Sequence, residues 1–245
     1  MQAIKPNWNA PQNVKAFTTL RHGGVSLVPY DSFNLGDHVG DDKNAVKINR
    51  TLLVEKCHLP QMPLFLNQTH STRVLTLPYD GEDFNADAVY TSQPNQVCLV
   101  MTADCLPVLF TNKQGTEVAA AHAGWRGLCD GVLEQTVAKF HCPHEDILAW
   151  FGPAIGPTAF QVGQEVIDQF VAQDPQAISA FIADPKAKDK FLGNLYQIAT
   201  QRLNTLGITQ ISGGEYCTYL EADKFFSYRR ENVTGRMASV VWING

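Results

Sequence analysis

Between residues 74 and 121 the chain alternates short apolar runs with polar turns, and this pattern limits the possible folds more than any other feature of the sequence. Each run is four to six residues long, which suits a β-strand and is too short for a buried helix. The sequence therefore predicts strands in close succession at Val74–Leu77, Ala88–Thr91, Val97–Thr102, Pro107–Phe110 and Glu117–Ala121.

Helical periodicity is confined to a few segments. We expect helices at Asn44–Cys57, Leu128–Phe140 and Leu195–Leu206. Asp41 or Asp42 can cap the start of the first, and Gly207 follows the last at a position suited to a left-handed C-cap. Further strands are expected at Val14–Leu20, Ile147–Phe151, Ile208–Ser212 and Met237–Ile243.

Strands and helices thus mix without the strict strand–helix–strand alternation of a parallel sheet, which indicates an α+β fold. The length of 245 residues allows one to two domains. No repeat, low-complexity tract or linker divides the chain. We therefore expect a single domain over residues 1–245.

Charge and composition narrow the class of partner. The chain has 19 Lys and Arg against 24 Asp and Glu, a formal net charge of −5, with no basic block. This argues against binding to nucleic acid or to an anionic membrane and favours a small-molecule partner. No apolar stretch approaches the roughly 20 residues of a membrane span, and the N-terminus lacks a secretory signal pattern. Together with six scattered cysteines, these features predict a cytoplasmic protein with reduced thiols.

Three segments each place one metal-ligand type at the edge of an apolar run. The residues are His70, Cys105 and His122, separated by 35 and 17 positions, so the spacing is not that of a local zinc finger. From spacing alone, Cys105 could equally be a small buried apolar residue and His122 a hydrogen-bonded core histidine. Two features favour a polar site: glycines follow His122, and Asp104 interrupts two apolar strands where burial without a partner would be costly.

The chain resembles the YfiH family over nearly its whole length. Members are described as purine nucleoside phosphorylases and were earlier labelled polyphenol oxidases or laccase-domain proteins. Eight separated motifs occur in the family's order. They are RHGGVS (21–26), SFNLG (32–36), LNQTHS (66–71), NADAVYT (85–91), TADCLPVLF (102–110), AHAGWRG (121–127), GPAIGP (152–157) and YRRENVTGRMAS (228–239).

The resemblance implies an α-β-β-α arrangement of mixed sheets covered by helices. It also implies one Zn²⁺ held by His70, Cys105 and His122, with a fourth position open to water or substrate, as in catalytic zinc sites. The same ligands could hold copper in a loaded preparation. A multicopper laccase is not expected, because the remaining histidines do not form the paired H-x-H motifs of a trinuclear copper cluster.

The implied reaction is phosphorolysis of adenosine, inosine and 5'-methylthioadenosine, with adenosine deamination as a second activity. Phosphate needs a cation, for which we favour Arg21 beside two glycines, with Arg229, Arg230 and Arg236 as alternatives. Asp104 is the expected acid/base, or else an orienting carboxylate.

Substrate contacts are expected from several polar side chains, namely Asn34, Gln68, Arg229 and Arg236. Asn34 could instead close an Asx turn, and we prefer this interpretation to a substrate contact for Asn34. Phe33, Trp125, Tyr90 and Phe226 are candidates for stacking on a purine, although aromatic residues are more often part of the core.

Two other functions fit the same residues. In a metal-free cysteine hydrolase acting on amide or peptidoglycan-precursor substrates, Cys105 would be the nucleophile and His122 its base. In a binding module, zinc would only stabilise the strands, and a fourth protein ligand, Cys98 or Cys129, would close the site. The sequence indicates no particular oligomeric state.

Overall fold

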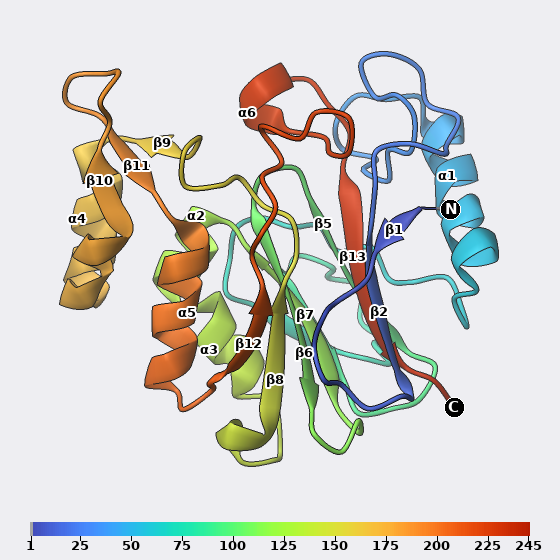
Figure 1. Cartoon of the computed structure of the whole chain (residues 1–245). Helices are drawn as coiled ribbons and strands as arrows, with labels where there is room; N and C mark the ends of the chain where they lie inside the picture. The colour runs from blue at the N-terminus through green and yellow to red at the C-terminus, as the bar shows by residue number, and fades with distance from the viewer. Residues whose placement is uncertain (1) are drawn as a thin grey trace.

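The computed structural model describes residues 2–245 and has the expected α+β architecture. Two β-sheets pack face to face, and helices cover their outer faces, which gives the layer order α-β-β-α (Figure 1). Helix α1 (Lys43–Cys57) covers one side, and α2 (Trp125–Asp130), α3 (Val132–Val137) and α5 (Leu195–Thr205) cover the other.

The two main sheets differ in pairing. The first is antiparallel, in the order β1 (Ala3–Ile4), β2 (Val14–Thr19), β13 (Met237–Ile243) and β5 (Val97–Thr102). The second is mixed, in the order β12 (Gln210–Gly213), β8 (Ile147–Phe151), β6 (Leu106–Asn112), β7 (Val118–Ala123), β4 (Ala88–Thr91) and β3 (Val74–Thr76). Its two edge strands pair in parallel, and its inner pairs are antiparallel.

Alternation along β5 explains why the central strands are apolar throughout. Cys98 and Val100 face the layer between the two sheets, whereas Leu99 and Met101 face the layer under α1. Because successive side chains of a strand point to opposite faces, a strand covered on both sides needs apolar residues at every position. The continuous apolar runs in the sequence therefore correspond to strands buried on both faces.

The expected helix over Leu128–Phe140 is two helices. Gly131, with φ of 102°, ends α2 and begins α3. This left-handed residue interrupts the helical path and is easily accommodated only by glycine. The other two helices agree closely with prediction: Asp42 caps α1, accepting a hydrogen bond from the Ala45 amide, and Gly207 follows α5 with φ of 86°.

A peripheral unit between residues 161 and 193 was not predicted. Its parts are helix α4 (Gln164–Gln173), a 3-10 helix (Pro175–Ala180) and a small antiparallel sheet of β10 (Phe181–Ala183), β11 (Phe191–Gly193) and β9 (Gln161–Val162). The strands have two or three residues, and Gly163 at the start of α4 provides no side-chain cap. Such elements leave little trace in a sequence pattern. Three other short elements, β1 (Ala3–Ile4), a 3-10 helix (His144–Asp146) and α6 (Tyr228–Glu231), escaped prediction for the same reason.

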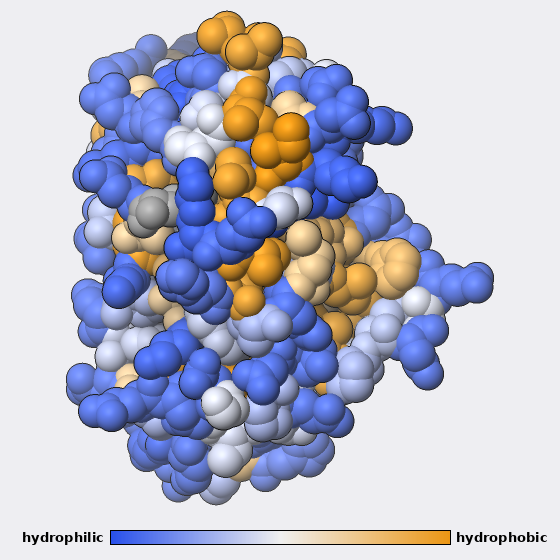
Figure 2. Space-filling view, turned by 90° about the vertical axis from the view of Figure 1, so that its right-hand side faces the viewer, coloured by the Kyte–Doolittle hydropathy of each residue, from blue (hydrophilic) through white to orange (hydrophobic). Residues whose placement is uncertain are grey.

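Figure 2 shows the side of the molecule that carries α1 and the loop before it, where an apolar stripe runs between polar side chains. Exposed apolar residues of that loop include Leu27 and Val28. None of the helices formed by residues 2–245 has both the length and the apolar character needed to span a bilayer.

Candidate functional site

Three candidate metal ligands from distant parts of the sequence meet at one point. His70, Cys105 and His122 each offer a ligand atom, and these atoms lie within 4.8 Å of one another. Sγ of Cys105 is 3.7 Å from Nε2 of His70, and the two imidazole rings are 4.9 Å apart between centroids. Ligands of one zinc ion with bonds of about 2.0 to 2.3 Å are separated by up to roughly 4 Å, so small side-chain rotations would close the group on an ion.

Strand pairing explains the convergence. Cys105 lies in the turn where the chain leaves β5 of one sheet and enters β6 of the other. The register of β6 with β7 sets Pro107 opposite His122, which brings Cys105 beside the histidine. Asp104 in this turn and His70 have φ of 92° and 62°, a left-handed conformation that is uncommon outside glycine and often marks functional sites.

A buried carboxylate that the sequence analysis missed organises the group. Asp87 has no solvent exposure, and its Oδ1 lies 2.8 Å from Nδ1 of His122 and accepts from the His70 amide at 3.0 Å. Its Oδ2 accepts from the amide and hydroxyl of Ser71 at 2.6 and 2.8 Å and from the Thr69 amide at 3.1 Å. With Nδ1 directed at Asp87, Nε2 of His122 is left to serve as a ligand.

The charges of the group favour a thiolate at Cys105 paired with a protonated imidazole at His122. Burial opposes a charged thiolate, yet the neighbouring His122 and His70 outweigh it and lower the pKa of Cys105 to about 6. Burial likewise opposes a charged His122, but Cys105 and Asp87 raise its pKa to about 9. Burial also acts to raise the pKa of Asp87, but the hydrogen bond and charge of His122 outweigh it and lower that pKa below its usual value. Cys105 is therefore prepared to act as a thiolate, the form that ligates metals, whereas His122 must release a proton when it binds one.

The donor set fits a single metal ion. One thiolate and two imidazoles suit Zn²⁺ and could also accept copper. Among residues 2–245 this is the one cluster of potential ligands found, and neither Cys98 nor Cys129 belongs to it. Cys98 is buried between the sheets, with Sγ 3.8 Å from the Val118 carbonyl, and Cys129 is buried in α2. The expected fourth protein ligand of a purely structural zinc site is thus not provided by either cysteine.

Gly124 leaves the space in which the ligands meet. A Cβ at this position would lie 2.6 Å from Cδ2 of His70 and 3.0 Å from Sγ of Cys105. We expect Gly124→Ala to displace His70 and to weaken metal binding at least about tenfold. The measurement is a competitive metal titration. Gly207→Ala is the control, because no atom lies within 4 Å of its Cβ position and its cost should be confined to backbone strain. Unchanged metal affinity in Gly124→Ala would contradict this description of the site.

The three ligands open into a cavity of about 500 Å³. Its wall includes five further residues that the sequence analysis named, Gln68, Asp104, Trp125, Arg229 and Arg236. It also includes residues that had not been considered, among them His38, Arg126, Phe160 and Tyr228. The volume is typical of a small-molecule site.

Two of the expected polar groups have their hydrogen bonds largely committed to protein. Asp104 accepts from the Thr218 hydroxyl and from the Arg229 amide, both at 2.6 Å. Gln68 exchanges hydrogen bonds with the backbone of Met101, donating to the carbonyl and accepting from the amide, both at 2.7 Å. Both side chains border the cavity, where they hold neighbouring segments in place.

Arg236 lines the cavity and interacts electrostatically with Cys105 of the ligand group. Burial lowers the pKa of its guanidinium, while Cys105 and Asp104 act in the opposite direction, which places these charges close together. Its Nη1 donates to the carbonyls of Thr234 and Gly235 at 3.1 and 3.0 Å. No hydrogen bond from Nε or Nη2 to another described residue is found, so these donors can face the cavity.

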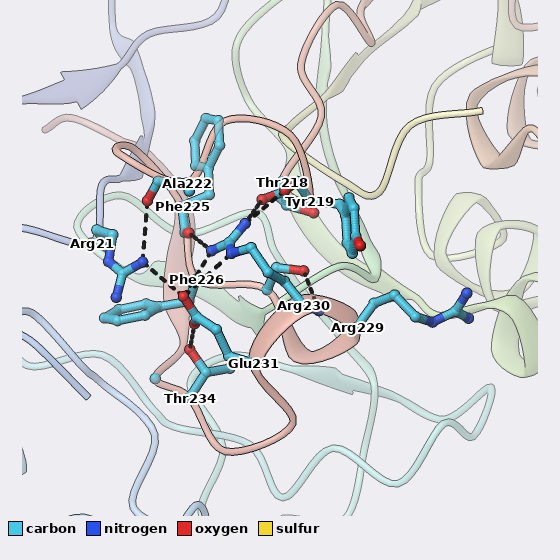
Figure 3. Close-up of polar contacts among 12 residues, drawn as sticks. Arg21, Thr218, Tyr219, Ala222, Phe225, Phe226, Arg229, Arg230, Glu231 and Thr234 are labelled. Atoms are coloured by element: carbon cyan, nitrogen blue, oxygen red, sulfur yellow. Dashed lines mark hydrogen bonds and ion pairs between the residues drawn. The ribbon is translucent and has the colours of Figure 1, made fainter. Parts of the chain in front are cut away.

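Arg21 and Asn34, both expected to meet substrate, do not line the cavity. The Arg21 guanidinium donates to Glu231 and to the Ala222 carbonyl and lies over the ring of Phe226 (Figure 3). Asn34 is fully buried and forms the Asx turn preferred for it, with Oδ1 accepting from the amides of Gly36 and Arg236, both at 2.9 Å. Arg21 therefore lies outside the cavity in which it was expected to bind phosphate, whereas Arg236 lines that cavity, and Asn34 fixes the Arg236 backbone. Arg230 is likewise outside the cavity lining.

The aromatic candidates separate by burial. Phe33, Tyr90 and Phe226 belong to the core, with exposures of 0%, 3% and 0%. Trp125 lines the cavity, together with Phe160 and Tyr228. Tyr228 is 55% exposed, an unusual position for a large aromatic side chain and one suited to contact with a planar ligand.

Comparisons with known proteins identify the family of the chain. A family model described as multi-copper polyphenol oxidoreductase laccase matches residues 15–244. A Haemophilus influenzae protein named purine nucleoside phosphorylase is 70% identical, with 99% of each chain covered, and Escherichia coli purine nucleoside phosphorylase YfiH is 55% identical, with 98% of each covered. The crystal structure of a Neisseria meningitidis protein, 47% identical, superposes with a TM-score of 0.95 over 100% of both chains. The chain belongs to the YfiH family, whose curated relatives are named purine nucleoside phosphorylases.

Proposed function

We propose that this protein is a zinc-dependent purine nucleoside phosphorylase that acts on adenosine, inosine and 5'-methylthioadenosine, with adenosine deamination as a second activity. The observation that carries the proposal is the position of His70, Cys105 and His122 on the wall of a cavity that also presents Arg236 and three aromatic side chains. The names of the relatives supply the reaction class.

The cavity can serve both substrates of a phosphorolysis. Cleavage of the glycosidic bond passes through an oxocarbenium-like state, so an anionic phosphate must be held against the sugar while the purine leaves. Arg236 is the phosphate ligand in this proposal, and Arg229 lies at the same wall. Trp125, Phe160 and Tyr228 provide the surfaces on which a purine ring packs.

His70, Cys105 and His122 would hold the zinc ion, which would supply a Lewis acid at the cavity wall. The residues of the chain then have separate tasks. Asp87 fixes the tautomer and the orientation of His122 through Nδ1. Asp104 orients Arg229 and Thr218 through its two carboxylate oxygens and borders the position where substrate binds.

Product identification tests the reaction class. Purified protein is incubated with adenosine or inosine, with and without phosphate, and bases and sugars are identified by mass spectrometry. A free purine base together with pentose 1-phosphate, formed only when phosphate is present, is the expected result. Free ribose irrespective of phosphate, or no purine product at all, would overturn the proposal. Inosine formed from adenosine without phosphate reports the deaminase activity separately.

Arg236→Met should raise the KM for phosphate about ten- to a hundredfold, because a charge-assisted hydrogen bond to an anion contributes about 1.5 to 3 kcal/mol. Zinc content should not change. The measurement is initial rate at varied phosphate and fixed inosine. Arg73→Met is the matched control, since Arg73 is an arginine outside the cavity that pairs with Asp83. A phosphate KM equal to that of the wild-type protein would exclude Arg236 as the phosphate ligand.

A cysteine hydrolase remains the second candidate because the geometry contains its machinery. Cys105, whose pKa is lowered, would be the nucleophile, and His122 would be its base. Asp87 would orient the base through its contact with Nδ1 of His122. A strong chelator distinguishes the two functions. Removal of the metal should stop a zinc-dependent phosphorylase, whereas a thiol nucleophile should keep its activity or gain from the removal.

A further inference from the structure

Helix α6 carries two residues of the cavity wall, Tyr228 and Arg229, yet it has little apolar anchoring of its own. It spans four residues, and none of them is buried. Burial of apolar surface is the usual force that fixes a helix on a protein, since so short a helix is not stable by itself. Something other than hydrophobic packing must therefore determine where α6 lies.

The carboxylate of Glu231, at the end of α6, accepts hydrogen bonds from three side chains. Oε1 of Glu231 accepts from Nη1 of Arg21 at 3.0 Å and from Nη2 of Arg230 at 3.1 Å, and Oε2 accepts from the Thr234 hydroxyl at 2.5 Å. The side chains of Arg21 and Glu231 are 11% and 27% exposed, so their ion pair is only partly hydrated. Figure 3 shows the two guanidinium groups on either side of this carboxylate.

The two arginines connect α6 to the segment before it. Arg230 donates to the carbonyls of Thr218, Tyr219 and Phe225 at 2.6, 2.9 and 2.7 Å. Arg21 donates to the Ala222 carbonyl at 3.1 Å. Residues 218–225 and α6 are thereby tied together through charged side chains (Figure 3).

The segment 218–225 and helix α6 both bond to Asp104, which lies on the cavity wall. One carboxylate oxygen accepts from the Thr218 hydroxyl and the other from the Arg229 amide, each at 2.6 Å. Asp104 is adjacent in sequence to Cys105. A continuous chain of hydrogen bonds thus runs from Arg21, which is distant in sequence, through Glu231 and Arg230 to Thr218 and on to Asp104.

We propose that Arg21, Arg230 and Glu231 form a positioning cluster that holds α6 at the cavity and so determines how Tyr228 and Arg229 meet the substrate. The proposal rests on the proposed function and extends it to residues that do not line the cavity. It gives Arg21 a role that differs from the phosphate binding expected from its sequence motif.

The first test is Glu231→Gln, which keeps the shape of the side chain and removes the charge shared by the two arginines. We expect kcat/KM for inosine to fall about tenfold, mainly through KM, with zinc content unchanged. Amide hydrogen exchange at residues 228–231 should accelerate at the same time. Arg21→Met should have a similar effect, and the double variant should lose little more than either single variant, because both single variants already break the Arg21–Glu231 ion pair.

A second ion pair provides the control. Arg202 and Glu134 are 2.6 Å apart, with side-chain exposures of 15% and 28%, and neither lines the cavity. Glu134→Gln and Arg202→Met should affect stability to a comparable degree and leave KM unchanged. Equal effects on KM from both pairs, or additive losses in the Arg21 and Glu231 double variant, would overturn the positioning role. Wild-type protein that forms no phosphate-dependent product would instead refute the proposed function, and hydrogen exchange at α6 would still test the cluster.

Discussion

Replacing Cys105 by alanine is expected to remove bound zinc and to lower purine nucleoside turnover at least about a thousandfold, because the variant loses the one thiolate of a three-residue ligand set. The remaining imidazoles of His70 and His122 cannot hold the ion with comparable affinity. His122 also loses the charge that, with Asp87, raises its pKa. Metal content measured by atomic emission and initial rates with inosine are the two readouts.

Cys142→Ala is the matched control for Cys105→Ala. Both cysteines are partly exposed free thiols, but Cys142 is not part of the ligand group. Its replacement should leave zinc content and activity unchanged. Loss of activity in Cys105→Ala with full zinc content would contradict a ligand role and favour the nucleophile of a cysteine hydrolase.

Much of the fold could be predicted because its central strands are covered on both faces. The runs Ala88–Thr91, Val97–Thr102, Ile147–Phe151 and Met237–Ile243 have the bounds expected from the sequence. Burial on both sides makes a strand continuously apolar, and polar turns then mark its ends. A short element without buried residues, such as α6, shows no contrast between apolar and polar residues, so the sequence pattern does not predict it.

The candidate metal ligands could be found from the sequence, whereas the residues that support them could not. His70, Cys105 and His122 are unusual residue types at the edges of apolar runs, so each attracts attention separately. Asp87 stands directly before a buried strand in the NADAVYT motif, which was a usable sign, but the function of a buried carboxylate depends on partners that are brought together by folding. The role of Arg21 also depends on partners that folding brings together. Its motif indicated a functional arginine, but its partners Glu231 and Ala222 are about 200 positions away in the sequence.

Asp87→Asn should weaken zinc binding about ten- to a hundredfold and lower the free energy of unfolding by about 3 kcal/mol. An asparagine can turn its oxygen towards His122 or towards the amides of Thr69 and Ser71, but not towards both. Its NH₂ group then faces N–H donors inside a site with no exposure to water, where an unsatisfied donor is costly. Urea unfolding of the metal-free protein and competitive zinc titration measure the two effects separately.

Glu117→Gln distinguishes a supporting role in metal binding from the general cost of altering a buried carboxylate. Glu117 is 6% exposed and accepts from the Tyr90 hydroxyl at 2.6 Å, the His141 amide at 2.8 Å and Asn112 Nδ2 at 3.0 Å. It resembles Asp87 in burial and bonding but lies outside the ligand group. Its variant should lose stability and retain the zinc affinity of the wild-type protein. If Asp87→Asn also bound zinc as tightly as wild type, Asp87 would serve the fold alone, and the orientation of His122 would have to come from the strand itself.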